Sequence, residues 1–407
     1  MNCRHCGTPL QISFLDLGFA PPSNSYLSKE GLSRPETYYP LRIKVCAHCW
    51  LVQTEDYAAA GDLFDPDYAY FSSTSSSWLA HALAYSEVMS SRFHLGQSSL
   101  VLEIASNDGY LLKNFVARGI PCLGVEPTES TATAAEKLGI PVLRRFFGEG
   151  LGRELATSGK HADLIVGNNV YAHVPDINDF TRGLHAALKP EGVITLEFPH
   201  ILRLLEQTQF DTVYHEHFSY LSLYAVDRIF RNSGLRIWDV DELQTHGGSL
   251  RVYGCHADAT HATTQAVGEM LATEERQGLR SLETYLNFQA RADRIKDELV
   301  KFLIEQKRLS RKVAAYGAAA KGNTLLNYAG IKPDLLPFIC DAALAKQGKF
   351  MPGSHIPILP PAALSAKRPD FLLILPWNIA EEVKQQNAHL AALGTKFVTA
   401  VPALEIT

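Results

Sequence analysis

The sequence predicts an α/β protein in which a small N-terminal metal-binding module precedes two domains of alternating strands and helices. Three observations support this prediction. Two Cys-x-x-Cys pairs stand within the first 50 residues, and short apolar strands alternate with helical segments between residues 100 and 200. A second alternation begins after residue 312, beyond a long charged segment with helical periodicity (264–308). Strands that alternate with helices are typical of parallel sheets covered on both faces.

Composition and charge argue against several classes of protein. The 407 residues carry a net charge of −5 and no long lysine or arginine run, which argues against a nucleic-acid partner. No apolar stretch approaches the ~20 residues of a membrane span, and the N-terminus has no apolar signal core. We therefore expect a cytoplasmic, monomeric enzyme with no membrane partner.

The seven cysteines form two groups. Three stand alone in apolar, strand-like runs, and four form the pairs "CRHC" and "CAHC". The paired cysteines are Cys3, Cys6, Cys46 and Cys49. Two thiolates from each tight turn suit the tetrahedral shell of Zn²⁺, and four sulfurs leave no open position for catalysis. We expect a structural zinc ion here, with His5 and His48 inside the pairs as competing ligand candidates.

Three domains follow from the order of these segments. Residues 1–75 are rich in proline, tyrosine and turn residues, as in small domains organised by a metal. Residues 76–260 hold the first alternation, which begins near a serine-capped amphipathic helix predicted over 72–93. Residues 261–407 hold the charged segment, predicted as one or two extended helices, and the second alternation.

Polar residues stand where strands of the first alternation end. Glu103 ends an apolar strand, and Gly109 opens the following turn to close backbone approach. Glu126 ends the next strand, where a carboxylate is placed to accept hydrogen bonds from two ribose hydroxyls. Asn168 and Asn169 end a later strand. Because ligands of open α/β sheets sit beyond the carboxyl ends of the strands, these residues predict a nucleotide pocket.

This arrangement resembles a class I S-adenosylmethionine (SAM) methyltransferase, whose acidic, glycine-rich loop corresponds to residues 103–109. Ala105 and Asn107 stand where the general pattern has glycines, so an unrelated doubly wound domain with a polar turn is the alternative. The resemblance implies SAM as the cofactor. The residues assigned to it are Glu103, Ala105, Asn107, Asp108, Gly109, Glu126, Asn168 and Asn169.

The chain as a whole resembles a narrower family, the zinc-containing sugar C-methyltransferases of deoxysugar biosynthesis. The paired cysteines are followed in order by "EIASNDGYLL", "YHEHFSYLS", "THGGSLRVY", "YGAAAKGNTLLNY" and "KQGKFMPGSHIPI", so the resemblance extends over nearly the full chain. It implies a structural zinc module, a SAM-binding Rossmann-like domain and a second, C-terminal Rossmann-like domain. The last of these helps to hold a nucleotide-diphosphate keto-sugar.

The resemblance also implies a reaction. A nucleotide-linked 4-keto-deoxysugar loses a proton next to its ketone, and the enolate accepts a methyl group, at sugar carbon 3. O- or N-methylation of a nucleotide sugar is the alternative, because the SAM domain alone does not distinguish the acceptor atom.

The stretch "TVYHEHFSYLS" is dense in groups that move protons. Carbon methylation through an enolate needs a base of near-neutral pKa and a donor to the enolate oxygen, and histidine suits the base. The family's active-site Tyr-x-Glu-His carries over to Tyr214, Glu216 and His217. We expect His217 to be the base, Glu216 to orient an imidazole and Tyr214 to donate to the oxygen. His215 is the less favoured histidine and is assigned to the sugar. For the motif as a whole, a metal site and structural hydrogen bonding are the alternatives to base chemistry.

Three more side chains are candidates. Tyr70, before the serine run, aligns best with an active-site tyrosine of the family, and Tyr68 is the second choice, assigned to the sugar. Aromatic packing between modules is the alternative for both. His246 in "THGGSL" is a candidate sugar contact, and capping of the glycine turn is its alternative.

The C-terminal "YGAAAKGNTLLN" has the spacing of a dinucleotide fingerprint, with Asp341 about 20 residues later. It therefore raises the alternative of an NAD-dependent oxidoreductase. However, Ala319 occupies the position where glycine lets the backbone approach pyrophosphate, and Lys321 adds a charge suited to a sugar diphosphate. We prefer contact of Lys321 and Asn323 with the nucleotide sugar. A zinc-ribbon interaction protein is a third possibility, but it leaves the acidic strand ends and the histidine motif unexplained.

Overall fold

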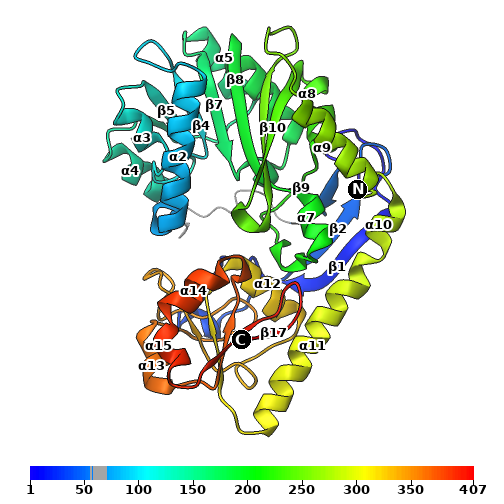
Figure 1. Ribbon diagram of the computed structural model, residues 1–407, viewed down its shortest axis with the longest axis vertical. Helices are drawn as coiled ribbons and strands as arrows, with labels where there is room; N and C mark the ends of the chain where they lie inside the picture. Colours follow the sequence, from blue (N-terminus) through cyan, green and yellow to red (C-terminus); the bar gives the residue numbers. More distant parts are fainter. Residues whose placement is uncertain (56, 58–70) are drawn as a thin grey trace.

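The computed structural model describes residues 1–55, 57 and 71–407, and the described chain forms three sheets. The largest sheet lies in the upper part of Figure 1 and the C-terminal domain in the lower part. Strands of the N-terminal module lie between them on the side of the long helix α11 (Phe288–Arg308). The zinc module is therefore not a peripheral appendage.

The N-terminal sheet is antiparallel, with the strand order β1-β2-β3-β9. Its strands are β1 (Ile12–Ala20), β2 (Tyr39–Val45), β3 (Val52–Thr54) and β9 (Ser219–Tyr220). The last strand comes from the histidine-rich motif, and Val52 pairs with Tyr220. The motif is thus hydrogen-bonded to the zinc module, and this long-range pairing was not predicted from the sequence.

The central sheet has seven strands in the order β10-β11-β8-β7-β4-β5-β6. They are β4 (Val101–Ile104), β5 (Cys122–Val125), β6 (Val142–Leu143), β7 (Ala162–Asn168), β8 (Leu188–Pro199), β10 (Leu235–Leu243) and β11 (Ser249–His256). The strands from β8 to β6 pair in parallel, as predicted. In contrast, β10 and β11 add antiparallel pairs, because the short turn η5 (Thr245–Gly247) joins them as a hairpin.

Helices flank the central sheet on both sides (Figure 1). The first, α2 (Ser76–Arg92), begins where predicted, since the Ser75 hydroxyl accepts a hydrogen bond from the Trp78 amide. The others are α3 (Leu112–Val116), α4 (Glu129–Glu136), α5 (Glu149–Thr157), α6 (Ile177–Ala187), α7 (Ile201–Glu206) and α8 (Leu223–Asn232). The fold is the predicted two-sided α/β domain.

The charged segment forms three helices rather than one or two. They are α9 (Gln265–Arg276), α10 (Leu282–Leu286) and α11. Gly278 ends the first helix in a left-handed conformation (φ 76°) that most residues avoid. The last helix runs down the side of the molecule, where Phe288 packs 4.7 Å (ring centroids) from Phe14 of the zinc module. It links the upper and lower parts.

The C-terminal domain is a second α/β unit with the strand order β14-β13-β12-β15-β16-β17. Its strands are β12 (Val313–Tyr316), β13 (Ile339–Cys340), β14 (Ile358–Leu359), β15 (Phe371–Ile374), β16 (Lys396–Thr399) and β17 (Glu405–Ile406). Its helices are α12 (Ala320–Tyr328), α13 (Ala362–Lys367), α14 (Ala380–Gln386) and α15 (Ala388–Ala391). Only the edge strand β17 pairs antiparallel within the described sheet.

Two hydrophobic cores meet at the zinc module. Phe14 and Ile43 belong to the core that continues into the C-terminal domain, whereas Cys46 and Leu51 belong to the core of the central sheet. The module therefore joins the two domains through buried side chains. Among the described helices, none is both long and apolar enough to cross a membrane.

Candidate active site

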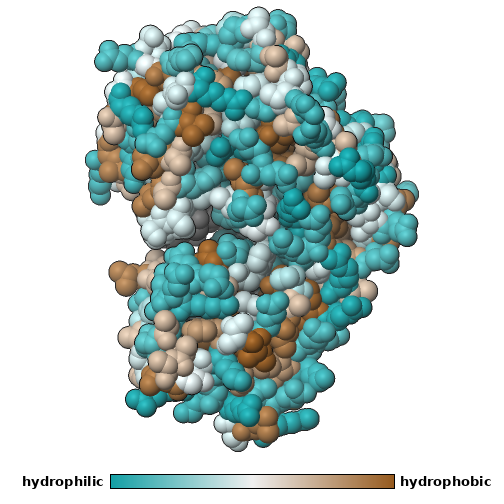
Figure 2. Space-filling model, viewed as in Figure 1, coloured by the Kyte–Doolittle hydropathy of each residue, from teal (hydrophilic) through white to brown (hydrophobic). Residues whose placement is uncertain are grey.

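A cleft of about 630 Å³ lies beyond the carboxyl ends of the central strands. Its lining comes from all three domains, including Asn24, Ala105, His217 and Lys321. Figure 2 shows the surface hollowed between the upper and lower parts of the molecule. Ligands of such sheets bind at this end, so the cleft lies where the sequence predicted a pocket.

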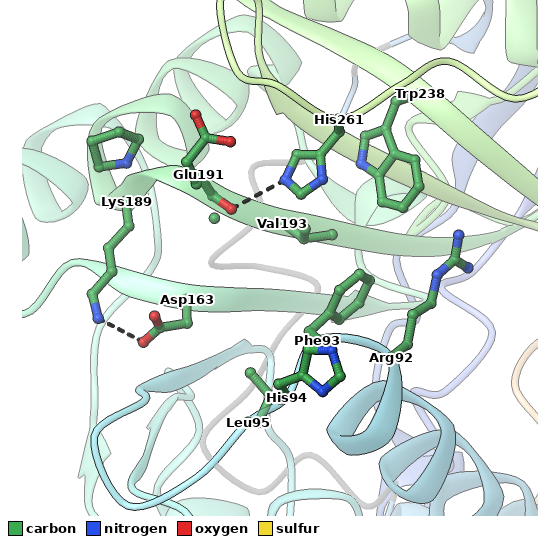
Figure 3. Close-up of a pocket in the computed structure, with 12 residues that line it drawn as sticks. Arg92, Phe93, His94, Leu95, Asp163, Lys189, Glu191, Val193, Trp238 and His261 are labelled. Atoms are coloured by element: carbon green, nitrogen blue, oxygen red, sulfur yellow. Dashed lines mark hydrogen bonds and ion pairs between the residues drawn. The ribbon is translucent and has the colours of Figure 1, made fainter.

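A second hollow of about 620 Å³ lies near the amino ends of β7 and β8. Arg92, Asp163, Trp238 and His261 are among its lining residues (Figure 3). None of the predicted site residues lines it. The cleft at the carboxyl ends is therefore the candidate active site.

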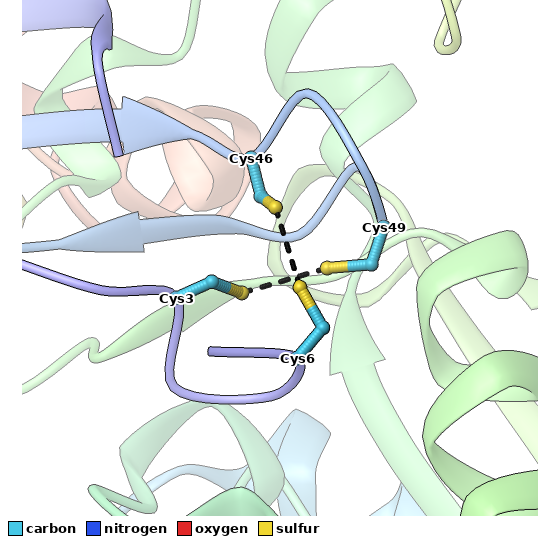
Figure 4. A group of neighbouring side chains, drawn as sticks. All are labelled: Cys3, Cys6, Cys46 and Cys49. Atoms are coloured by element: carbon cyan, nitrogen blue, oxygen red, sulfur yellow. Dashed lines mark hydrogen bonds between the residues drawn. The ribbon is translucent and has the colours of Figure 1, made fainter. Parts of the chain in front are cut away.

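The four predicted metal ligands form one cluster in the zinc module (Figure 4). All their sulfurs lie within 4.8 Å of one another, with 3.5 Å between Cys3 and Cys49 and 3.6 Å between Cys6 and Cys46. Zn–S bonds of about 2.3 Å hold tetrahedral sulfurs about 3.8 Å apart, whereas disulfide sulfurs are bonded at about 2 Å. The donor set and its spacing fit a zinc ion.

The histidines inside the two Cys-x-x-Cys pairs make their contacts outside this cluster. The Nδ1 atom of His5 lies 2.8 Å from Oδ1 of Asn178, and His48 accepts from Arg228. Gln53 instead turns toward the metal site and donates to the Cys3 sulfur at 3.3 Å. Among the described residues the candidate ligand set is therefore the four sulfurs, which would fill the tetrahedral shell of zinc.

The loop after β4 has an unusual backbone. Ala105 and Asn107, which stand where the methyltransferase pattern has glycines, adopt φ values of 57° and 49°. Gly109 follows at φ 78°, and a Cβ atom there would come within 2.4 Å of Ile140. Non-glycine residues pay a conformational cost in this region, and such residues gather at ligand sites. The loop thus has the left-handed backbone conformation that glycine favours, although alanine and asparagine occupy these two positions.

Two carboxylates of this segment, those of Glu103 and Asp108, are buried. Glu103 is 1% exposed, and its pKa is raised well above the usual range, first by burial and then by Glu126 and Asp108. Asp108 accepts a hydrogen bond from the backbone amide of Ser73. Asp108 therefore holds the short turn η2 (Ser72–Thr74), just before α2, against the loop.

Glu126 lines the cleft at the end of β5. Its two oxygens accept from the backbone amides of Asn107 (3.0 Å) and Thr128 (2.9 Å), and also from the Thr128 hydroxyl. Each carboxylate oxygen has two lone pairs, so capacity remains for a ligand. Glu126 also ties the two loops at this edge together.

Asn168 and Asn169 complete this side of the cleft. Asn168 is 8% exposed, and both polar atoms of its buried amide lack a partner within the described chain. Asn169 has a left-handed backbone (φ 54°). Buried amide groups are rarely left unsatisfied, so the amide of Asn168 has its hydrogen-bonding capacity left for a ligand in the cleft.

His217 also lines the cleft, and it is 7% exposed. Its Nδ1 atom is 3.0 Å from the carbonyl oxygen of Thr212. Burial, and then the neighbouring imidazole of His173, lower the pKa of His217 well below its usual value. The ring is therefore neutral, with Nδ1–H donating to Thr212 and a lone pair on Nε2.

Two rings hold the imidazole of His217 in place. Tyr214 lies on one side, with ring centroids 4.0 Å apart, and His173 meets the ring edge-on at 4.6 Å. Burial lowers the pKa of His173 to about 4, although a hydrogen bond with the backbone of Glu216 opposes that effect. His173 is thus neutral near neutral pH as well, and a proton on either ring would disfavour protonation of the other.

Glu216 contacts a residue of the zinc module. Its carboxylate oxygens lie 2.9 and 3.0 Å from Nδ2 of Asn24, and both residues line the cleft. The ring of His217 is oriented by Thr212 rather than by this carboxylate. His215 lies behind the cleft, 8% exposed, with Nε2 donating to the carbonyl of Tyr39 at 3.3 Å. It does not line the cavity.

His246 lines the cleft from the turn between β10 and β11. Its backbone is left-handed (φ 55°), and its Nε2 atom lies 3.2 Å from Nδ2 of Asn169. The ring of Trp78 meets it edge-on at 5.2 Å. Burial, and then the charge of Lys321, lower the pKa of His246 to about 4. Capping of the glycine turn alone does not explain a ring placed in the cavity.

The C-terminal wall carries the predicted lysine. Lys321 donates to Oδ1 of Asn378 at 2.6 Å, and its ammonium lies 4.6 Å from the ring centroid of Trp377. Burial lowers its pKa, and the nearby carboxylate of Asp211 opposes that effect. Asn323 is fully buried, bonds Asn327 and does not line the cleft.

The dinucleotide fingerprint has a structural explanation. Asp341 uses its carboxylate to accept from the backbone amides of Ala318 (2.7 Å) and Ala343 (2.8 Å). At Gly317 a Cβ atom would come within 2.4 Å of Pro376, so this glycine permits packing within the domain. Neither feature is arranged for the ribose of NAD.

Several residues of the cleft carry little signal in the sequence. Four lining residues were not predicted: His173, Thr212, Asn24 and Trp78. Thr212 acts through its backbone oxygen, and the other three are far from the histidine motif in the sequence. The sequence "NNVYAHVP" held the one local signal, since a histidine follows the strand-end asparagines. The predicted residues Tyr68 and Tyr70 lie outside the described residues.

Models of known domain families match most of the chain. Three family models match: a zinc-binding domain over residues 3–64, a methyltransferase domain over 81–240 and a C-methyltransferase C-terminal domain over 244–402. Among solved structures, magnesium protoporphyrin IX methyltransferase from Synechocystis PCC 6803 is 13% identical, with a TM-score of 0.33, covering 44% of this chain and 78% of that one. A SAM-dependent methyltransferase from Clostridium acetobutylicum is 11% identical, with a TM-score of 0.35, covering 43% and 90%.

A full-length relative carries the identification. The chain is 34% identical over 404 residues to C-methyltransferase NovU from Streptomyces niveus. The aligned region covers 98% of this chain and 95% of that protein. The four-sulfur cluster, the strand-end carboxylates and the cleft agree with the predicted zinc and SAM sites. The chain therefore belongs to the family of zinc-containing, SAM-dependent C-methyltransferases.

Proposed function

We propose that the enzyme methylates carbon 3 of a nucleotide-linked 4-keto-deoxysugar through an enolate. The observation that carries this proposal is the neutral imidazole of His217, whose Nδ1–H is committed to Thr212 and whose Nε2 lone pair is left for the cleft. A base of this kind removes a proton next to a ketone, where the negative charge passes to oxygen. The resemblance of the whole chain to sugar C-methyltransferases supports the substrate class.

The cofactor side of the cleft is assigned to the strand-end residues. Glu126 accepts the ribose hydroxyls, and the strained loop receives the remainder of the cofactor with Ala105, Asn107, Asn168 and the adjacent Asn169. Glu103 and Asp108, also assigned to the cofactor, are buried behind this lining and would act through it. Bound there, SAM supplies an electrophilic methyl group. The cleft residues exclude water and hold the acceptor carbon between this side and His217.

The substrate side is assigned to the zinc module and the C-terminal domain. Lys321 faces the cleft and carries the positive charge for the diphosphate, and Glu216, fixed by Asn24, accepts from a sugar hydroxyl. Tyr214 donates to the ketone oxygen. His215 and Asn323, also assigned to the sugar, lie behind the cleft wall and would act only through the residues in front of them.

The test is incubation of the full-length enzyme with methyl-labelled SAM and a panel of nucleotide-linked 4-keto-sugars. We expect a new carbon–carbon bond at carbon 3, identified by NMR of the product. The matching 4-hydroxy sugars are the control, because they lack an acidic carbon-bound proton. Label on another carbon would correct the position, and label on oxygen or nitrogen, or none, would overturn the proposal.

The remaining predictions can be checked independently. We infer three domains bounded at residues 1–75, 76–260 and 261–407, which limited proteolysis would test. We also infer a monomer, which sedimentation would test. Four clustered cysteines without a disulfide are in keeping with the reducing cytoplasm, and localisation of a tagged chain would test this inference.

A further inference from the structure

The cleft holds two neutral imidazoles whose hydrogen bonds impose opposite tautomers. A backbone carbonyl only accepts, so the Thr212 carbonyl requires Nδ1–H on His217. An amide nitrogen only donates, so Nδ2 of Asn169 requires a lone pair on Nε2 of His246, 3.2 Å away. His246 therefore carries its proton on Nδ1. One ring offers a lone pair to the cleft and the other offers an N–H.

We propose that His246 is a second catalytic residue, whose Nδ1–H donates a hydrogen bond to the ketone oxygen of the substrate as that oxygen gains charge. This proposal rests on the proposed function and deepens it. When His217 takes the proton at Nε2, the C–H bond breaks, the new carbon–carbon double bond forms, and an electron pair moves to the oxygen. His246 stabilises that oxygen without giving up its proton, and Tyr214 supplies the other hydrogen bond that an enolate oxygen accepts.

The surroundings of His246 support this role. Nδ1 of His246 makes no hydrogen bond within the described chain, and it is not buried away from solvent. Its N–H is therefore available to a ligand in the cleft. The following glycines make a tight turn (φ 89° and 112°), and at Gly247 a Cβ atom would lie 2.5 Å from Trp377. The backbone of His246 is itself strained, as is common where a side chain must be held for function.

A rigid network fixes the ring from the side. Trp78, which meets His246 edge-on, is stacked on His81 at 4.8 Å. His81 lies 2.8 Å from a carboxylate oxygen of Glu197, and Arg251 donates to the other oxygen at 2.8 and 2.6 Å. Glu197 is fully buried. A donor preorganised in this way stabilises developing charge without first having to reorganise.

Neutrality is the second requirement for such a donor. Burial and the neighbouring charge of Lys321 lower the pKa of His246 to about 4, so its ring is neutral near neutral pH. A neutral imidazole polarises a carbonyl without protonating it, which keeps the enolate nucleophilic.

The first experiment compares His246→Leu with His246→Gln in the full chain. We expect His246→Leu to slow methyl transfer, and exchange of the substrate's acidic proton with deuterated water, by ~10²-fold or more, as for loss of one such donor. His246→Gln keeps an N–H donor and should retain at least about a tenth of the rate. His261→Gln is the matched control, because His261 donates to the carbonyl of Glu191 in the second hollow (Figure 3).

Two outcomes would overturn the proposal. One is an exchange rate of His246→Leu within about threefold of the wild type, against the ~10²-fold loss expected. The other is a raised KM with unchanged kcat, which would make His246 a contact to a sugar hydroxyl. Failure of the proposed function looks different, because the wild-type enzyme itself would then neither methylate nor exchange any keto-sugar.

A second measurement does not depend on activity. Nitrogen-15 NMR of the imidazoles distinguishes the two tautomers, and we expect the proton of His246 on Nδ1. Asn169→Asp replaces the donor with an acceptor and should move that proton to Nε2. A wild-type His246 protonated on Nε2 would overturn the proposal, whatever the variants do.

Discussion

Nδ1 of His217 lies 3.0 Å from the carbonyl oxygen of Thr212, and this contact determines which ring nitrogen keeps its lone pair. Asp211, the residue before Thr212, is fully buried and accepts from the indole N–H of Trp377 at 2.8 Å. The C-terminal domain therefore helps to hold the segment that orients the imidazole. Chemistry assigned to the central domain depends in this way on a tryptophan of another domain.

His217→Asn should retain SAM and sugar binding but lose methyl transfer by at least ~10²-fold, the low end for loss of a general base. Exchange of the substrate's acidic proton with deuterated water should fall with it, because proton removal precedes methylation. Both rates are measured by NMR, with an unreactive SAM analogue present for exchange. His261→Asn is the control, since His261 lines the second hollow and not the cleft. Near-normal turnover in His217→Asn would eliminate it as the base.

Glu126→Ala should weaken SAM binding by roughly 1.5–3 kcal/mol, because two ribose hydroxyls lose a charged acceptor. The loss also frees the backbone amides of Asn107 and Thr128, so the loop itself is expected to loosen. Titration calorimetry gives the affinity. Glu129→Ala is a control of equal charge, because Glu129 pairs with Arg144 at the surface. Unchanged affinity in Glu126→Ala would mean that the ribose lies elsewhere.

Features encoded locally could be predicted from the sequence. The two cysteine pairs and the alternation of strands and helices lie within short windows, and the structure has both. The backbone of the loop also fits the methyltransferase pattern, since Ala105 and Asn107 adopt the left-handed conformation that glycines would supply. A pattern search that demands glycine would miss this loop, because the backbone conformation is what it shares with the pattern.

Long-range and backbone contacts could not be predicted. The acceptor that orients His217 is a main-chain oxygen of Thr212, which no side-chain motif reveals. Asn24 reaches Glu216 across almost 200 residues because β9 joins the N-terminal sheet. Lys321 and Asn323 stand two apart on α12, and such residues lie on different sides of a helix, so only Lys321 lines the cleft.

Purified enzyme should contain about one zinc ion per chain, and Cys46→Ser should lower zinc content and stability, because a closed four-sulfur site contributes to folding. The effect should spread beyond the module, since Cys46 belongs to the core of the central sheet. Metal analysis and thermal unfolding measure the two effects. Cys122→Ala is the matched control, as Cys122 is buried in β5 outside the cluster. Freshly purified, unchelated protein without zinc would contradict the prediction.

Stability should fall as the pH is lowered, because the cleft buries neutral histidines. Burial lowers the folded-state pKa of His173 and of His246 to about 4, and that of His217 well below its usual value. In the unfolded chain each ring titrates near its ordinary pKa of about 6.5. Between these values the unfolded chain binds more protons, so the free energy of unfolding rises with pH, and above them the histidines contribute no pH dependence. At about pH 5 the loss is at most about 2 kcal/mol for each such histidine.

Urea unfolding at several pH values measures the slope of the free energy of unfolding against pH. This slope should be shallower in His246→Gln but not in His94→Gln, an exposed position outside the cleft. An unchanged slope in His246→Gln would show that this ring is protonated as easily in the folded enzyme as in the unfolded chain.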